Sequence, residues 1–245
     1  MKIALVGTGQ MGQAIASLAP DRGHHIVAQF DSAQPLMAAA PEDLNGAKVV
    51  IDFSLPGVVL RHIERYCQWQ QPAVIGTTGW YDEMDRVEHW VEAHEGTLLY
   101  APNFSLGVAL LRQAVEHLTP LLDELPDFDA YVHEMHHTQK VDSPSGTARM
   151  LANVLIDGLE RKTHLEPEAQ HDRIDPKALH VSSTRAGSVF GEHTVGLDSP
   201  YDHVTLRHRA KNRKGFAFGA LRAAEWLPGR TGLFTLDDLL ADWLA

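Results

Sequence analysis

The sequence has one cysteine, Cys67, among 245 residues, so no internal disulfide can form. That composition fits a reducing cytoplasm. No run of about 18 apolar residues occurs, and an apolar strand begins directly after Met1, so we expect neither a membrane-spanning nor a signal segment. Positive charge is also scarce: the formal net charge is −11, which argues against nucleic acid or an anionic membrane surface as partner.

The first 31 residues carry a dinucleotide-binding pattern. An apolar strand over residues 2–6 runs into a Gly-x-Gly-x-x-Gly turn, and a helical stretch follows to about Leu18. A second strand, residues 26–30, ends at Asp31, where this pattern expects an acid for the adenosine ribose. A glycine turn without nucleotide is the alternative. The turn residues are Gly7, Thr8, Gly9, Gln10, Met11 and Gly12.

Strands and helices then alternate, which predicts a doubly wound parallel sheet of the Rossmann type. Strands are expected over residues 48–53, 73–75 and 97–100, with helices between them. Ligands of such sheets sit beyond the carboxyl ends of the strands. Two turns fall at that edge, although plain turn chemistry would also explain them. Their residues are Gly76, Thr77, Thr78 and Gly79, and Ala101, Pro102, Asn103 and Phe104.

After a helix over residues 106–118 the pattern changes, which predicts a second domain. A strand over residues 127–132 precedes a helix over 148–159, and alternating segments over 179–184, 188–197 and 203–209 indicate an antiparallel or mixed sheet. Helices over 215–227 and 236–244 could return to cover the first domain. The second domain would then be an insertion.

The stretch over residues 134–147 is the main candidate for chemistry. His136, His137 and Lys140 precede a Ser-Pro-Ser-Gly-Thr turn, where Ser143 or Ser145 can cap the next helix. The free N–H groups at a helix start bind anions. Histidine and lysine can move protons near neutral pH. The pattern predicts a pocket that binds a carboxylate and transfers a proton, and ordinary surface histidines are the alternative.

The segment from His133 to His137 also matches the His-Glu-x-x-His zinc signature, which requires a helix. The preceding alternation indicates a strand, in which four residues span about 13 Å and separate the two histidines. We therefore reject the zinc-peptidase interpretation and expect no metal. Arg185, Glu192, His193 and the basic run over 211–214 remain ambiguous, with Arg213 the best candidate among them for a site role.

The stretch over 134–148 closely resembles the signature of the dihydrodipicolinate reductase (4-hydroxy-tetrahydrodipicolinate reductase) family of bacterial lysine and diaminopimelate biosynthesis. The segments 76–79, 101–105, 184–187, 191–194 and 232–234 also resemble that family, in its order. The resemblance implies a cytoplasmic, NAD(P)H-dependent oxidoreductase that reduces a cyclic dicarboxylate to tetrahydrodipicolinate. It also implies a Rossmann domain over residues 1–105 and 213–245, with an inserted substrate and oligomerisation domain over 106–212 that forms a homotetramer.

By the same resemblance, His136 is the proton donor and acceptor and Lys140 is a second proton donor. His137, Gly146 and Thr147 would bind the substrate carboxylates. The turns at 7–12, 76–78 and 101–104, with Asp31, would line the cofactor.

Departures from the family concern the cofactor. The glycine turn is one residue shorter than in many members, and the segment between Asp31 and Lys48 is compressed. Members that use NADPH well often carry arginine after the acid, whereas this chain has Ser32. Asp31 would repel a 2′-phosphate, so we expect NADH to be preferred and NADPH to be possible. The alternatives are another two-domain reductase, such as an aspartate dehydrogenase, and a non-catalytic dinucleotide sensor.

Overall fold

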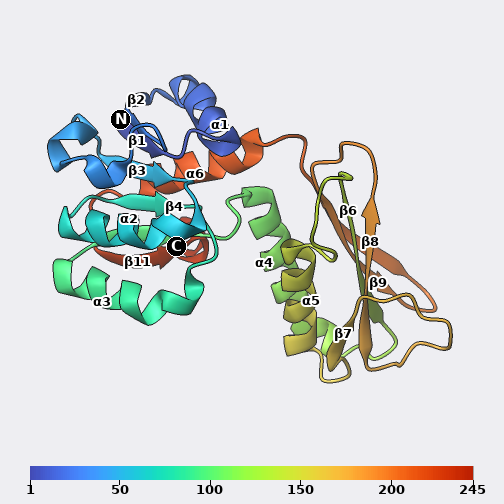
Figure 1. Ribbon diagram of the computed structural model, residues 1–245. Helices are drawn as coiled ribbons and strands as arrows, with labels where there is room; N and C mark the ends of the chain where they lie inside the picture. The colour runs from blue at the N-terminus through green and yellow to red at the C-terminus, as the bar shows by residue number, and fades with distance from the viewer. Residues whose placement is uncertain (245) are drawn as a thin grey trace. The chain divides into compact units, whose positions relative to one another are not determined.

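The computed structural model describes residues 1–244, which form two compact units. Residues 1–106 and 213–244 make the first unit, and Gly107–Asn212 make the second. The chain therefore leaves the first unit once and returns to it, as the colours of Figure 1 show. Within residues 1–244, every helix is too short or too polar to cross a membrane.

The first unit contains the predicted Rossmann-type parallel sheet. Its six strands lie in the order β11-β5-β4-β3-β1-β2, and all neighbouring pairs are parallel. The edge strand β11 pairs with β5 and was not predicted as a strand. The bounds are β1 Lys2–Val6, β2 His25–Phe30, β3 Val49–Asp52, β4 Ala73–Ile75, β5 Thr97–Tyr100 and β11 Gly232–Thr235.

Five α-helices accompany this sheet. Helices α1 and α6 come from opposite ends of the chain and pack together (Figure 1). Gly219 of α6 permits close packing, because a Cβ there would lie 1.8 Å from the carbonyl oxygen of Phe104. The bounds are α1 Gln10–Leu18, α2 Pro56–Gln68, α3 Met84–His94, α6 Lys214–Trp226 and α7 Leu236–Leu244. Short 3-10 turns are η1 Pro20–Arg22, η2 Leu36–Ala38, η3 Pro41–Leu44 and η4 Tyr81–Glu83.

The second unit contains the predicted mixed sheet, with strand order β10-β9-β6-β8-β7. Strand β6 runs parallel to β8 and antiparallel to β9. Side chains from helices α4 and α5 form one apolar core with the sheet. The bounds are α4 Leu106–Asp123, β6 Asp129–His136, α5 Gly146–Gly158, β7 His164–Glu166, β8 Ala178–Arg185, β9 Glu192–Asp198 and β10 His203–Arg209.

Strand β6 is longer than the sequence predicts. The expected end at residue 132 is wrong, because pairing with β8 and β9 continues along the strand and reaches His136. The alternation between buried and less buried positions continues along the strand as well: Ala130, Val132, Glu134 and His136 are buried. The last two buried positions are thus polar, and they place a carboxylate and an imidazole side by side.

Candidate functional site

Two clusters of polar groups stand out, one in each unit. In the first unit, the glycine turn after β1 packs its backbone tightly. Gly7 has φ 90°, and a Cβ there would lie 2.2 Å from the carbonyl oxygen of Phe53. A Cβ on Gly12 would lie 2.1 Å from the carbonyl oxygen of Gly7. Helix α1 then begins after Gly9 without a side-chain cap, so its first N–H groups are available to an anion.

A cavity of about 400 Å³ adjoins this helix start. It lies at the carboxyl ends of β1, β3 and β4, where the strand order reverses, which is where doubly wound sheets bind ligands. Its lining includes six residues that the sequence predicts for cofactor binding: Gly9, Gln10, Met11, Gly76, Thr77 and Thr78. Sequence reasoning missed Phe53, Ser54 and Pro56, although their place directly after β3 was a usable signal.

Asp31 lies at the end of β2 and is held as an ionised acceptor. Its carboxylate accepts hydrogen bonds from the Thr8 hydroxyl at 2.9 Å and from the N–H of Ala33 at 2.8 Å. The Thr8 hydrogen bond, followed by the N–H groups of Ala33 and Gln34, lowers the pKa of Asp31. The acid is therefore fixed beside the glycine turn.

The other predicted cofactor residues have different surroundings. Ala101 and Phe104 are buried, and the Phe104 ring packs edge-on against Phe53 at 5.9 Å between centroids. Pro102 and Asn103 lie between them, after β5, and this turn does not contribute to the cavity lining. Together the tight glycine backbone, the open helix start and the fixed acid fit a dinucleotide.

A buried hydrogen-bond network around Asp52 holds one residue of the cavity lining. The Asp52 carboxylate accepts from the Tyr66 hydroxyl at 2.8 Å and from the N–H of Ser54 at 2.8 Å, and it lies 2.9 Å from Nδ1 of His62. Burial and the nearby Asp52 raise the pKa of Tyr66, so its hydroxyl stays protonated. Ser54, which lines the cavity, is thereby held in place.

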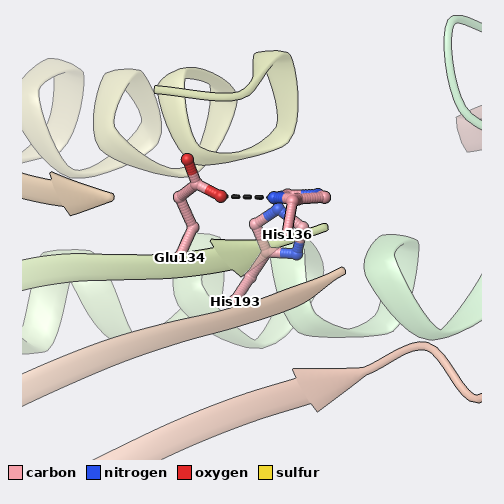
Figure 2. Close-up of side chains that lie close together, drawn as sticks. All are labelled: Glu134, His136 and His193. Atoms are coloured by element: carbon pink, nitrogen blue, oxygen red, sulfur yellow. Dashed lines mark hydrogen bonds and ion pairs between the residues drawn. The ribbon is translucent and has the colours of Figure 1, made fainter. Parts of the chain in front are cut away.

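In the second unit, Glu134 and His136 of β6 and His193 of β9 gather on one side of the sheet (Figure 2). Glu134 is opposite His193 in the strand register. One carboxylate oxygen of Glu134 contacts Nδ1 of His136, and the other accepts from Nη2 of Arg185 at 2.7 Å and from the N–H of Ser145 at 3.2 Å. Burial alone would raise the pKa of Glu134, but the hydrogen bonds from His136 and Arg185 hold it well below its usual range.

His193 is neutral near physiological pH. Burial, and then the neighbouring His136, lower the pKa of His193 to about 4. Its Nε2 lies 3.1 Å from the hydroxyl of Ser145, which caps α5 by accepting from the N–H of Ala148. The two imidazole rings are edge-on, with centroids 5.1 Å apart. Sequence reasoning left His193 and Arg185 ambiguous because their contacts with β6 arise only from sheet pairing.

Lys140 and the start of α5 share one carboxylate. Asp142 lies 2.7 Å from Nζ of Lys140 and accepts from the N–H of Gly146 at 3.3 Å. Partial burial would raise the pKa of Asp142, but the hydrogen bond from Lys140 outweighs it and lowers that pKa. Ser145, rather than Ser143, caps the helix.

The remaining predicted residues lie around this turn. His137 follows the last residue of β6, and its carbonyl accepts from the N–H of Lys140 at 3.2 Å. Thr147 is in the first turn of α5. Arg213 immediately precedes α6 and is the first residue of the returning segment of the first unit.

The zinc-signature residues do not lie on a helix. His133 is within β6 and points to the sheet face opposite His136, where its Nδ1 lies 2.8 Å from the Ser182 hydroxyl. A different set of donors, Glu134, His136 and His193, lies within 4.8 Å of one another. Both oxygens of Glu134 are already engaged by N–H donors, one of them a guanidinium, so this arrangement favours proton chemistry over a cation site.

Comparisons with known proteins give one consistent family. The family model described as "Dihydrodipicolinate reductase, N-terminus" matches residues 1–104, and the model of the C-terminus matches residues 107–240. The chain is 38% identical to 4-hydroxy-tetrahydrodipicolinate reductase of Christiangramia forsetii, over 99% of this chain and 98% of that protein. It is 32% identical to the Staphylococcus aureus (strain Newman) enzyme of the same name, over 98% of this chain and all of that protein.

A solved structure has the same fold. It is a dipicolinate-bound dihydrodipicolinate reductase from Paenisporosarcina sp. TG-14, with a TM-score of 0.77 and 22% identity, covering 96% of this chain and 97% of that one. The two family models together span both units, and the two relatives align from end to end. The chain therefore belongs to the dihydrodipicolinate reductase family and is an NAD(P)H-dependent oxidoreductase.

Proposed function

We propose that the chain reduces 4-hydroxy-tetrahydrodipicolinate to tetrahydrodipicolinate, with His136 as the proton donor and acceptor and Lys140 as a second proton donor. A bound nicotinamide cofactor supplies the hydride. The substrate gains one hydride and one proton and releases one water. The curated relatives carry the name of this reaction, and the Paenisporosarcina structure holds dipicolinate, a cyclic dicarboxylate.

The observation that carries this proposal is the position of the Asp142 carboxylate. It contacts both Lys140 and the N–H of Gly146. A carboxylate of the protein thus occupies two groups, the ammonium of Lys140 and the N–H of Gly146 at the start of α5. We assign both groups to the binding of a substrate carboxylate. We assign His137 and Thr147, which flank these groups in the chain, to the same recognition.

Proton transfer is assigned to His136 because its environment suits it. The imidazole is at the end of β6, its Nδ1 faces an ionised carboxylate, and its side chain retains 10% exposure. The developing negative charge after hydride arrival needs a proton at once, and a positioned imidazole provides one near neutral pH.

NADH is the proposed preferred cofactor, with NADPH possible. Asp31 is fixed and ionised next to the glycine turn, and the exposed Ser32 brings no cation to it. A ribose diol can donate to Asp31, whereas a 2′-phosphate would be repelled. We assign to the cofactor the three groups of residues described above: Gly7 to Gly12, Gly76 to Thr78, and Ala101 to Phe104.

The family resemblance also leads us to propose a dinucleotide-binding role for the first unit and a substrate-binding and oligomerisation role for the second, with the chain a cytoplasmic homotetramer.

The test is the loss of nicotinamide absorbance with NADH or NADPH. The substrate is made in the assay from pyruvate and aspartate semialdehyde, by the synthase that condenses these two compounds. Oxidation that depends on the synthase is expected. Cofactor binding without oxidation would contradict the proposed reaction and favour a dinucleotide sensor. Oxidation with oxaloacetate and ammonia, but not with the synthase product, would favour an aspartate dehydrogenase.

A further inference from the structure

Glu134 has neither a proposed catalytic nor a proposed binding role, yet it is among the most constrained side chains of the second unit. It is fully buried, and both oxygens are engaged. Arg185 and the N–H of Ser145 hold Oε1 from two separate elements, β8 and the start of α5. Only Oε2 is left for His136 (Figure 2).

This geometry fixes which nitrogen of His136 carries a hydrogen. Arg185 and a backbone N–H are donors only, and an ionised carboxylate is an acceptor only. The Nδ1 of His136 must therefore donate to Glu134. Nε2 is the remaining nitrogen, the one that can gain and lose a proton.

Space beside Nε2 is also provided. Gly191 faces it with φ 142°, and a Cβ at this position would lie 3.0 Å from Nε2. His193 lies edge-on to His136, and the charged or titratable groups that act on His193 include His208 and Lys140. Nε2 of His193 is hydrogen-bonded to the Ser145 hydroxyl at 3.1 Å, so His193 does not compete for the Glu134 carboxylate.

We propose that Glu134 is the positioning residue of His136: its carboxylate holds the Nδ1–H of the imidazole, orients the ring and leaves Nε2 to deliver the proton. Arg185 and Ser145 fix the carboxylate in turn. This inference rests on the proposed role of His136. It adds one requirement: when His136 is protonated between turnovers, the ionised carboxylate of Glu134 stays hydrogen-bonded to its Nδ1–H.

Glu134→Gln tests this directly. The amide oxygen must replace Oε1 toward the two donors, Arg185 and Ser145, so the NH₂ group faces His136 and donates to Nδ1. The neutral imidazole is then held with its hydrogen on Nε2, so Nε2 cannot accept a proton. The amide NH₂ group also prevents protonation of Nδ1. We expect kcat to fall by about 10²- to 10⁴-fold with KM nearly unchanged, as in other enzymes whose catalytic imidazole is held in the wrong tautomer.

Glu192→Gln is the matched control. It removes the same charge from the neighbouring strand, but Glu192 pairs with Arg207 and is on the opposite sheet face from His193. Its kcat should stay within about twofold of wild type. If Glu134→Gln also kept kcat within about threefold, the positioning role would be refuted.

A second readout depends neither on turnover nor on the folding of Glu134→Gln. Nitrogen-15 NMR of histidine-labelled wild-type protein, with His136 assigned by difference from His136→Gln, should show a protonated Nδ1 in neutral His136. A neutral ring protonated at Nε2 would overturn the inference. Failure of the proposed function is distinguishable, because the wild-type protein itself would then show no synthase-dependent oxidation.

Discussion

The carboxylate of Asp142 contacts two groups that we assign to binding of the substrate carboxylate. The Asp142 carboxylate must leave Lys140 and the N–H of Gly146 before a substrate carboxylate can bind there. Asp142→Asn weakens this internal competitor, because an amide binds an ammonium less strongly than a carboxylate does. We expect the KM for the cyclic dicarboxylate to fall by roughly 3- to 10-fold, with little change in kcat. Steady-state kinetics would check this.

The matched control is Asp157→Asn, an exposed acid near the other end of α5. Its KM should equal that of the wild type. A higher KM in Asp142→Asn would instead mean that Asp142 helps to build the site.

Lys140 has a separate expected effect. Lys140→Ala removes the proposed second proton donor and one cation for the substrate carboxylate, whereas the residues that we assign to the cofactor are all in the first unit. We expect turnover to fall by about 100-fold or more, with unchanged NADH binding by fluorescence titration. Lys177→Ala, an exposed lysine of the same unit, serves as control. Near-normal turnover in Lys140→Ala would show that the assignment is wrong.

We also expect the choice between NADH and NADPH to depend on the residue after Asp31, which is Ser32. Wild-type kcat/KM should be higher with NADH, and Ser32→Arg should raise the NADPH/NADH ratio of kcat/KM by about fivefold or more, because a guanidinium offsets Asp31. Ser32→Gln, of similar reach without charge, should not. Equal specificity constants for the two cofactors in the wild type would contradict the prediction.

At the scale of elements, the sequence is informative wherever local pattern decides the structure. Strands β1, β4 and β5 and helix α7 have the predicted bounds, because each combines an apolar run with clear turn residues. Strands β7 and β11 are short and were not predicted. Their pairing with β8 and β5 comes from partners distant in sequence.

The same limit applies to the site. The stretch over 134–147 was recognisable because its residues are consecutive and chemically unusual. Arg185 and His193 reach Glu134 only through the register of β8 and β9, which one strand's sequence cannot specify. Alternation along β6 would have placed Glu134 beside His136, had the strand been extended past residue 132.

The sheet of the second unit should lose stability in mild acid because of His193. Its pKa is about 4 in the folded chain, against 6.5 for an ordinary histidine. Between these values the unfolded state binds a proton that the folded state does not, so stability is complete above about pH 6.5 and is lost as the pH falls toward 4. His193 alone accounts for a loss of about 3 kcal/mol in the free energy of unfolding over this pH range.

Urea unfolding of the full chain at several pH values measures this slope. His193→Gln, whose amide group can still form a hydrogen bond with the Ser145 hydroxyl, should flatten this slope between pH 6.5 and 4. His171→Gln, at an exposed site, should not change it. An unchanged slope in His193→Gln would mean that His193 is not held neutral in the folded chain.

At the scale of the whole molecule, the roles that we propose are divided between the two units. The glycine turn, the cavity and Asp31 belong to the first unit, and the groups that we assign to carboxylate binding and proton transfer belong to the second. Substitution of a proton-transfer residue should therefore abolish chemistry without disturbing the cofactor site.

The most direct test is His136→Gln, measured for both synthase-dependent NADH oxidation and NADH binding. We predict that kcat falls by about 10²- to 10⁴-fold while the Kd for NADH stays within about twofold of wild type. A kcat within about tenfold of wild type would contradict the assignment of His136 as the proton donor.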